Sequence, residues 1–224
     1  MSFSDPQHVA RYVEGPVRQV PGLHAMQTMA ALLLAEHVPA DGRVLILGAG
    51  GGLELKVFAE RNPGWRFLGV DPSEAMLALA RTTLGPLASR VEWQAGLIHD
   101  APDAPCDGAT CLLTLHFLPA EERLRTLRAL WQRLKPGAPL IVAHHSFPQH
   151  APDKARWLTR YAAFSEASGL PAAEARNAIA AVGSRLPTLA PEADERLLQV
   201  AGFAQVELFY AAFTFRGWVA RKPA

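Results

Sequence analysis

Short apolar runs alternate with amphipathic stretches over the middle of this 224-residue chain. Five of these runs have the length of strands, and they cover residues 43–47, 65–70, 90–94, 107–113 and 140–144. Helical patterns separate most of them, over residues 51–61, 73–84 and 120–134. Strands that alternate with helices join into parallel sheets through right-handed crossovers, so the pattern predicts an α/β fold.

The pattern changes at both ends of the chain. Before the first strand we expect two helices, over residues 7–13 and 24–38. After the fifth strand, two helical stretches follow each other without a strand between them, over residues 153–169 and 172–186. A helix over 191–201 and an aromatic, alternating hairpin over 205–221 complete the prediction. We therefore expect an N-terminal helical lid over 1–38 and a domain over 39–224. This domain contains a helical insertion at about 148–188. We expect the insertion to lie over the carboxyl ends of the strands, where open α/β sheets bind ligands.

The composition of the chain limits which partners it can bind and indicates in which cellular compartment it is located. Hydrophobic residues make up 50% of the chain and charged residues 19%, which is typical of a globular protein. The net charge of +1 gives no general attraction for nucleic acid, and no apolar stretch approaches the ~20 residues that cross a bilayer. The N-terminus lacks the pattern of a secretion signal. Cys106 and Cys111 are expected as one loop thiol and one core thiol, which favours a reduced, cytoplasmic location.

A glycine turn follows the first strand, at Gly48-Ala49-Gly50-Gly51-Gly52. The second strand then ends in one carboxylate, Asp71, nineteen residues past Gly52. This layout is typical of a nucleoside-binding βαβ unit, in which glycines admit the ligand and the carboxylate accepts hydrogen bonds from ribose hydroxyls. A dinucleotide fingerprint needs a small residue where this chain has Leu53, so the pattern favours a nucleoside without a pyrophosphate and argues against a nicotinamide oxidoreductase.

Four landmarks in this order resemble the class I S-adenosylmethionine-dependent methyltransferases. They are the segments 44–52, 69–77, 91–96 and 134–140. The resemblance spans the chain from about Val38 to its end. It implies a Rossmann-like, seven-stranded, mostly parallel sheet with an antiparallel last strand and helices on both faces. It also implies S-adenosylmethionine as the cofactor.

The cofactor site follows from the turn, from the resemblance and from the strand ends. The residues expected to bind the cofactor are Arg18, Gly48, Ala49, Gly50, Gly52, Asp71, Pro72, Leu97, Ile98 and Leu113. Two positions depart from the family pattern, because Ile46 and Leu97 stand where family members often carry acidic residues. The methionine ammonium group therefore needs another anchor, for which we consider the carbonyls of Gly48 and Leu113.

A closer resemblance is to the carboxy-S-adenosylmethionine synthases of tRNA wobble-uridine modification. It rests on the segments 18–22, 114–118 and 202–209. That branch makes a carboxylated sulfonium from prephenate and S-adenosylmethionine, and needs polar groups for the added carboxylate. By our alignment Leu23, Leu112 and Leu197 replace three of them, although Arg196 restores one if the register shifts by a residue. A buried, unpaired carboxylate is costly, so we expect ordinary S-adenosylmethionine, its carboxylate paired with Arg18.

The chemistry expected is in-line methyl transfer to a small-molecule acceptor. His116 and His145 are the candidate general bases, because they follow the fourth and fifth strands; His144 alternates to the opposite face. Dense aromatic residues after the fifth strand suit a small acceptor better than nucleic acid. We expect no metal site and no membrane partner, and a homodimer by family analogy. Two alternatives stay open: a carboxy-S-adenosylmethionine synthase-like enzyme and a non-catalytic S-adenosylmethionine-binding protein.

Overall fold

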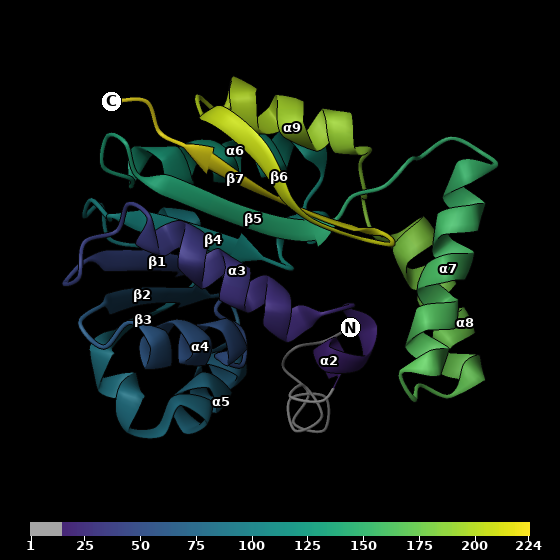
Figure 1. The fold of residues 1–224 in the computed structure, drawn as a ribbon, viewed down its shortest axis with the longest axis horizontal. Helices are drawn as coiled ribbons and strands as arrows, with labels where there is room; N and C mark the ends of the chain where they lie inside the picture. Colours follow the sequence, from purple (N-terminus) through teal and green to yellow (C-terminus); the bar gives the residue numbers. More distant parts are fainter. Residues whose placement is uncertain (1–14) are drawn as a thin grey trace.

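A computed structural model describes residues 15–224 as a seven-stranded sheet covered by helices (Figure 1). The strands are β1 Arg43–Leu47, β2 Arg66–Asp71, β3 Val91–Ala95, β4 Gly108–Leu112, β5 Pro139–His145, β6 Ala204–Ala212 and β7 Phe215–Arg221. Their order across the sheet is β3-β2-β1-β4-β5-β7-β6. The first five are parallel, and β7 runs antiparallel to β5 and β6. The predicted Rossmann-like fold class is confirmed.

Apart from α2 Gly15–Gln19, the α-helices agree with the predicted stretches, with small differences at their ends. The helices that agree are α3 Leu23–Ala35, α4 Leu53–Arg61, α5 Glu74–Leu84, α6 Ala120–Gln132, α7 Asp153–Ala167, α8 Ala172–Ala180 and α9 Pro191–Val200. The short helix α2 was not predicted, and the helix expected over 7–13 lies outside the described residues. The helix expected over 172–186 changes at Ala181 to a wider π turn that ends at Arg185.

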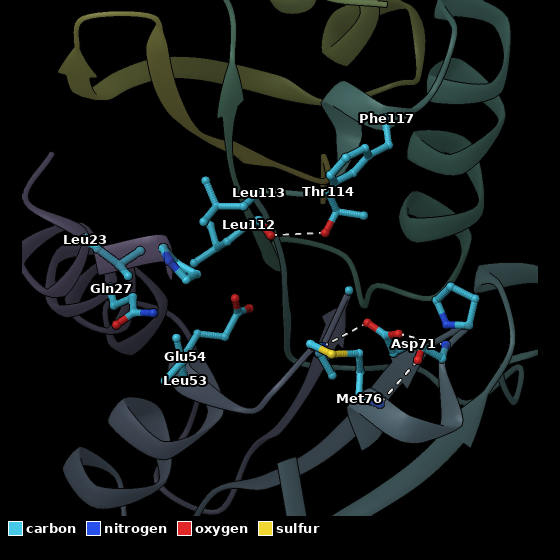
Figure 2. Close-up of a pocket in the computed structure, with 16 residues that line it drawn as sticks. Leu23, Gln27, Leu53, Glu54, Asp71, Met76, Leu112, Leu113, Thr114 and Phe117 are labelled. Atoms are coloured by element: carbon cyan, nitrogen blue, oxygen red, sulfur yellow. Dashed lines mark hydrogen bonds between the residues drawn. The ribbon is translucent and has the colours of Figure 1, made fainter. Parts of the chain in front are cut away.

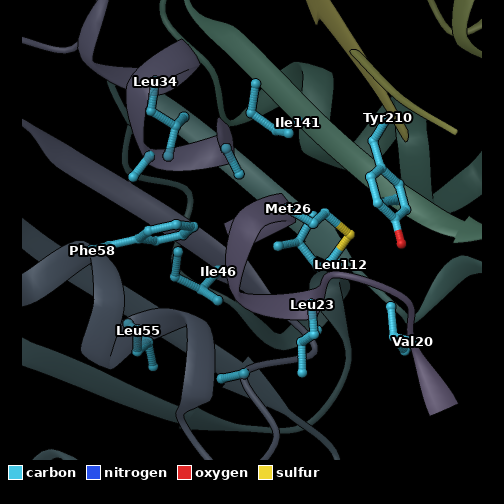
Figure 3. Packing of buried hydrophobic residues seen from close by; sticks show 14 of the residues in the cluster. Val20, Leu23, Met26, Leu34, Ile46, Leu55, Phe58, Leu112, Ile141 and Tyr210 are labelled. Carbon is cyan, nitrogen blue, oxygen red and sulfur yellow. The ribbon is translucent and has the colours of Figure 1, made fainter. Parts of the chain in front are cut away.

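The side chains of β1 alternate between two apolar clusters. Val44 and Ile46 pack against α3 and α4, and Leu45 and Leu47 pack on the opposite face with α6 and α9. Figure 3 shows Phe58 of α4 beside Ile46 in the first cluster. Because helices cover both faces, the strand is apolar from Val44 to Leu47, as the sequence pattern predicts.

The two helices of the insertion lie at one end of the sheet, where Tyr161 of α7 contacts His145 of β5 and Phe215 of β7. Figure 1 shows α7 and α8 to the right of the sheet, beyond the end toward which β5 runs. They pack against each other, and α7 also contacts α2. This position agrees with an insertion at the carboxyl ends of the strands. The division into a lid over 1–38 and a domain over 39–224 stays a prediction.

Both cysteines are free and buried. Cys111 lies in β4, and Cys106, which was expected in a loop, is also enclosed because it pairs with Leu134 in an isolated bridge. Between residues 15 and 224, no three His, Cys, Asp or Glu side chains are grouped so that they could hold a metal ion. In the same range, no helix has the length and apolar character needed to span a membrane.

Candidate functional site

The glycine turn after β1 forms the floor of a pocket at the carboxyl edge of the sheet. Gly48 has φ +78° and Gly50 has φ +49°, in the left-handed region that favours glycine. A Cβ atom at position 48 would lie 2.0 Å from the Thr114 hydroxyl oxygen. The turn therefore requires glycine at position 48 both for its conformation and for the space beside Thr114.

The pocket is mostly apolar, with polar groups on opposite sides (Figure 2). Its lining residues are Pro16, Leu23, Gln27, Gly48, Ala49, Gly50, Leu53, Glu54, Asp71, Pro72, Ser73, Met76, Leu112, Leu113, Thr114 and Phe117. Figure 2 shows Asp71 on one side and Glu54 and Gln27 on the other. An elongated ligand with different polar groups at its two ends fits this distribution.

Asp71 ends β2 and faces the pocket with its carboxylate held in place. One oxygen accepts a hydrogen bond from the Gly50 amide at 2.9 Å, and the other accepts one from the Ser73 amide at 2.9 Å. Burial raises the pKa of this carboxyl, and the two amides oppose that rise. Each carboxylate oxygen can accept further hydrogen bonds, so Asp71 can bind two hydroxyls of a ribose.

Glu54 is a pocket residue that the sequence analysis missed. It lies in the first turn of α4, is only 7% exposed, and accepts a hydrogen bond from the Thr110 hydroxyl at 2.8 Å. Burial raises its pKa from 4.5 to about 8, and the Thr110 hydroxyl opposes this rise. An acid in the first turn of a helix is ordinarily explained by the helix dipole, so position alone gave no signal of a ligand.

Gln27 is the second polar side chain that was missed. It lies on α3 among apolar neighbours and is 3% exposed, and its side-chain oxygen has no hydrogen-bond partner among residues 15–224. A buried amide with an unpaired oxygen is uncommon and calls for an explanation. The sequence signal that could have identified it is a single amide among the apolar residues that form the buried face of this helix.

The predicted cofactor residues divide into two groups. Those that line the pocket are Gly48, Ala49, Gly50, Asp71, Pro72 and Leu113. Those outside the lining are Arg18, Gly52, Leu97 and Ile98. Their roles toward a cofactor stay predictions.

The exposure and the contacts of the four residues outside the lining explain where they lie. Arg18 is exposed on α2. A Cβ at Gly52 would lie 3.0 Å from the Ala80 Cα, so this glycine permits the packing of α4 on α5. Leu97 is 57% exposed, with its amide bonded to the Asp100 carboxylate at 2.8 Å, and Ile98 belongs to the apolar core.

His116 and His145 lie together in the interior, outside the pocket lining. The backbone amide of His145 donates to the His116 Nδ1 at 3.4 Å, and the His145 ring stacks on Phe215. Its Nδ1 lies 2.9 Å from the Thr214 hydroxyl oxygen. Burial lowers the pKa of His145 to about 3 and that of His116 well below 6.5, so both rings are neutral at pH 7. Their assignment as general bases stays a prediction.

His144 and His145 point to different partners, as the alternation of a strand predicts. The His144 Nε2 lies 3.3 Å from an Asp194 carboxylate oxygen, whereas the His145 ring lies beside Tyr161. His144 is also outside the pocket lining. It belongs to an ionic cluster between β5 and α9.

The three leucines that replace carboxylate-binding residues in our alignment lie in two different parts of the structure. Leu23 and Leu112 line the pocket, with 3% exposure each. Leu197 packs in the cluster on the other face of the sheet. Arg196, the possible replacement, is exposed on α9 and is not part of the lining.

Comparisons of sequence relate this chain to a methyltransferase domain family and to carboxy-S-adenosyl-L-methionine synthases. A family model described as a methyltransferase domain matches residues 45–140, from β1 to the start of β5. The carboxy-S-adenosyl-L-methionine synthase of Erwinia tasmaniensis is 30% identical over 92% of this chain and 85% of its own length. The enzyme of the same name from Chromohalobacter salexigens is 29% identical over 98% of this chain and 83% of its own.

Comparisons of structure support the fold. An O-methyltransferase family protein from Burkholderia thailandensis matches with a TM-score of 0.70 at 16% identity, over 99% of this chain and 62% of that protein. Human N-acetylserotonin methyltransferase, solved with S-adenosylmethionine, matches with a TM-score of 0.61 at 15% identity, over 99% of this chain and 60% of that protein. The present chain therefore spans about three-fifths of the length of these solved proteins.

Proposed function

Because this chain belongs to the class I S-adenosylmethionine-dependent methyltransferases, we propose that its pocket binds S-adenosylmethionine and that the enzyme transfers the methyl group in line to a small-molecule acceptor. S-adenosylmethionine is the cofactor of this family. When bound, it supplies a methyl group activated by attachment to a sulfonium.

The observation that carries the proposal is the pairing of the glycine turn with Asp71. The Gly50 amide fixes the Asp71 carboxylate at 2.9 Å, directly beside the backbone that carries no Cβ at Gly48. A ribose at this carboxylate lies against the turn without steric hindrance. The lining residues therefore fit a nucleoside, and the largely apolar walls fit one without phosphates.

The segment after β4 forms the wall on which we place the acceptor. Leu113 has φ +58°, a conformation that is unfavourable for a leucine, and its amide donates to the Ala143 carbonyl at 2.6 Å. Thr114 and Phe117 follow it in the lining. This wall positions an acceptor and excludes water, which are the main contributions an enzyme makes to such a transfer.

The ionisable residues of the lining, within the described range 15–224, are Glu54 and Asp71. Both are carboxyls, and Asp71 is committed to the ribose in this proposal. We therefore infer an acceptor whose nucleophile needs no base from the pocket, such as a neutral amine, a thiolate or a phenolate.

The second candidate is carboxy-S-adenosylmethionine synthesis. It is favoured by relatives that bear that name, among them the two described above, which match more than nine-tenths of this chain. Leu23 and Leu112 argue against it, because they give the pocket apolar walls where an added carboxylate needs donors.

The test is calorimetric titration with S-adenosylmethionine and S-adenosylhomocysteine. We expect both to bind, and Asp71→Ala to weaken both by roughly 10-fold or more, since one acceptor of charged hydrogen bonds is lost. Asp103→Ala is the matched control, because Asp103 is 88% exposed in a loop outside the lining. Absence of binding by the wild-type protein would overturn the cofactor assignment.

An acceptor screen with S-adenosylmethionine then separates the functions. Formation of S-adenosylhomocysteine with a small molecule supports the methyltransferase. A carboxylated sulfonium product, formed with prephenate, would identify the synthase instead. Tight binding with no product from any acceptor would favour a non-catalytic binding protein. A homodimer, also expected from the family, is tested by the mass of the protein in solution.

A further inference from the structure

Two buried polar side chains lie together on the side of the pocket opposite Asp71 (Figure 2). Glu54 comes from α4 and Gln27 from α3, and these two helices pack against each other. Leu23, Leu53 and Leu112 surround them in the lining. The two polar groups therefore form an isolated polar patch within an apolar wall.

Neither group is satisfied by the rest of the described chain. Thr110 is the hydrogen-bond partner of the Glu54 carboxyl among residues 15–224, and no Lys, Arg or His in that range forms an ion pair with it. The Gln27 oxygen lacks any partner in the same range. A buried carboxyl and a buried amide oxygen cost free energy unless a donor reaches them.

We propose that Glu54 and Gln27 together bind a primary ammonium group, which is the amino-acid end of the cofactor. This inference rests on the proposed function. The patch offers hydrogen-bond acceptors, and an ammonium group supplies three donors and a positive charge. A sulfonium has the charge but no N–H, so it leaves the Gln27 oxygen unpaired. The amide of Gln27 can turn by 180° at no change in shape, which lets its oxygen face the donor.

The position of Glu54 explains how the chain does without an acid in β1. Ile46 of β1 pairs in register with Thr110 of β4, and Thr110 donates to Glu54. The carboxyl therefore reaches the sheet beside Ile46 although it originates from the helix after the turn. The ammonium anchor is then a side chain, in place of the Gly48 and Leu113 carbonyls considered from sequence.

The test compares Glu54→Gln with the wild type on three probes. S-adenosylmethionine carries the ammonium and the sulfonium, S-adenosylhomocysteine carries the ammonium alone, and methylthioadenosine carries neither. We expect Glu54→Gln to weaken the first two by roughly 10- to 100-fold and to leave methylthioadenosine within about 2-fold. The glutamine keeps the shape and can still accept from Thr110, so the fold is retained.

The controls separate this inference from the proposed function. Glu60→Gln makes the same change on the exposed face of α4 and is expected to leave all three affinities unchanged. Asp71→Ala is expected to weaken all three probes. If wild-type protein binds none of them, the proposed function fails. If all three bind and Glu54→Gln weakens them equally, or weakens S-adenosylmethionine alone, the ammonium site is wrong.

A second variant tests the partner residue. Gln27→Met removes the acceptor at nearly constant length and is expected to weaken S-adenosylhomocysteine by about 3- to 10-fold without affecting methylthioadenosine. An unchanged affinity for S-adenosylhomocysteine would show that Gln27 does not bind the ammonium group. The role of Glu54 is tested separately by Glu54→Gln.

Discussion

The two carboxyls of the pocket differ in how the chain holds them. Asp71 accepts from two backbone amides, which are fixed by the turn and by the start of α5. Among residues 15–224, Glu54 has one hydroxyl partner, and its burial raises its pKa to about 8. Without a ligand, Glu54 is therefore largely neutral at pH 7, and a cationic ligand favours its ionised form.

Glu54 makes the ligand-free protein less stable as the pH rises. Its pKa is about 8 in the folded protein and 4.5 as the ordinary value, so folding takes up a proton between these pH values. The contribution of Glu54 to stability is therefore fully present below pH 4.5 and is lost through this window, by a total on the order of 5 kcal/mol. We expect Glu54→Gln to melt within about 2 °C of the wild type at pH 5 and several degrees higher at pH 8.

The comparison isolates Glu54 because the neighbouring ionisable groups are the same in both proteins. The elements that pack against α4 carry the ionisable residues His24, Glu74, Arg81 and Arg90. Cys111 lies in β4, next to the Thr110 that donates to Glu54, and Asp71 lies across the pocket. Glu60→Gln, measured by the same thermal scans, should show no such pH-dependent gain. A constant difference between Glu54→Gln and wild type at both pH values would contradict the raised pKa.

Two glycines of the turn should respond differently to alanine. Gly48→Ala places a Cβ against Thr114 inside the pocket, whereas Gly52→Ala places it against α5 outside the pocket. Both have positive φ, and the added Cβ would lie 2.0 Å from Thr114 at position 48 and 2.7 Å from Leu84 at position 52. We therefore expect each variant to lose at least about 1–2 kcal/mol of stability. S-adenosylhomocysteine affinity, measured below the melting transition, should fall only in Gly48→Ala. Equal loss in both would mean that Gly52 also contacts the ligand.

Sequence reasoning reached the residues whose role depends on local backbone geometry. Gly48, Gly50 and Asp71 were predicted because a turn and a strand end leave a recognisable spacing. Glu54 and Gln27 were missed because they come together in the pocket only through the packing of α3 against α4. Spacing along the chain carries no information on that contact.

At the scale of elements, a buried ionic cluster joins β5, α6 and α9. Arg123 of α6 forms an ion pair with Asp194 of α9, which also lies 3.3 Å from His144 of β5. Burial raises the pKa of the Asp194 carboxyl, but His144 and Arg123 lower it by more. Arg123 also donates to the Pro187 carbonyl at 3.1 Å, so it fixes the segment that leads into α9.

Removing one partner of this cluster should destabilise the fold strongly. Arg123→Met leaves the buried Asp194 carboxylate without its arginine partner, and we expect a loss of about 3–5 kcal/mol in denaturant unfolding. Arg125→Met, in the same helix, breaks an exposed, solvent-screened pair with Glu122 and should leave the stability nearly unchanged.

The double variant Arg123→Met/Asp194→Leu checks the cause. If the unpaired carboxylate is responsible, replacing it as well should recover more than half of the loss. A double variant no more stable than Arg123→Met would instead attribute the loss to the contacts of Arg123 with backbone carbonyls.

Most elements could be predicted because hydrophobic periodicity and helix stop signals are local. The stop after α4 and the Ser73 cap of α5, which accepts from the Met76 amide at 3.3 Å, are examples. The five-residue helix α2 was missed because so short a stretch shows less than two turns of pattern. The π turn at 181–185 was missed because it departs from the α-helical period.

At the scale of the whole molecule, the pocket is built by the carboxyl ends of three strands together with the N-terminal helices. The carboxyl ends of β1, β2 and β4 supply Gly48, Asp71 and Leu113 to one pocket. The N-terminal helices contribute Pro16 and Gln27 to the same pocket. The insertion, by contrast, contributes no residue to this lining within the described chain. The acceptor therefore cannot be derived from the motifs that define the fold.

The measurement that tests this account most directly is a crystal structure of the protein with S-adenosylhomocysteine. We expect both ribose hydroxyls to bond to the Asp71 carboxylate and the ammonium group to lie between Glu54 and Gln27, with the thioether facing Leu113 and Thr114. A ligand bound elsewhere, or one whose amino-acid end points away from Glu54, would contradict the account.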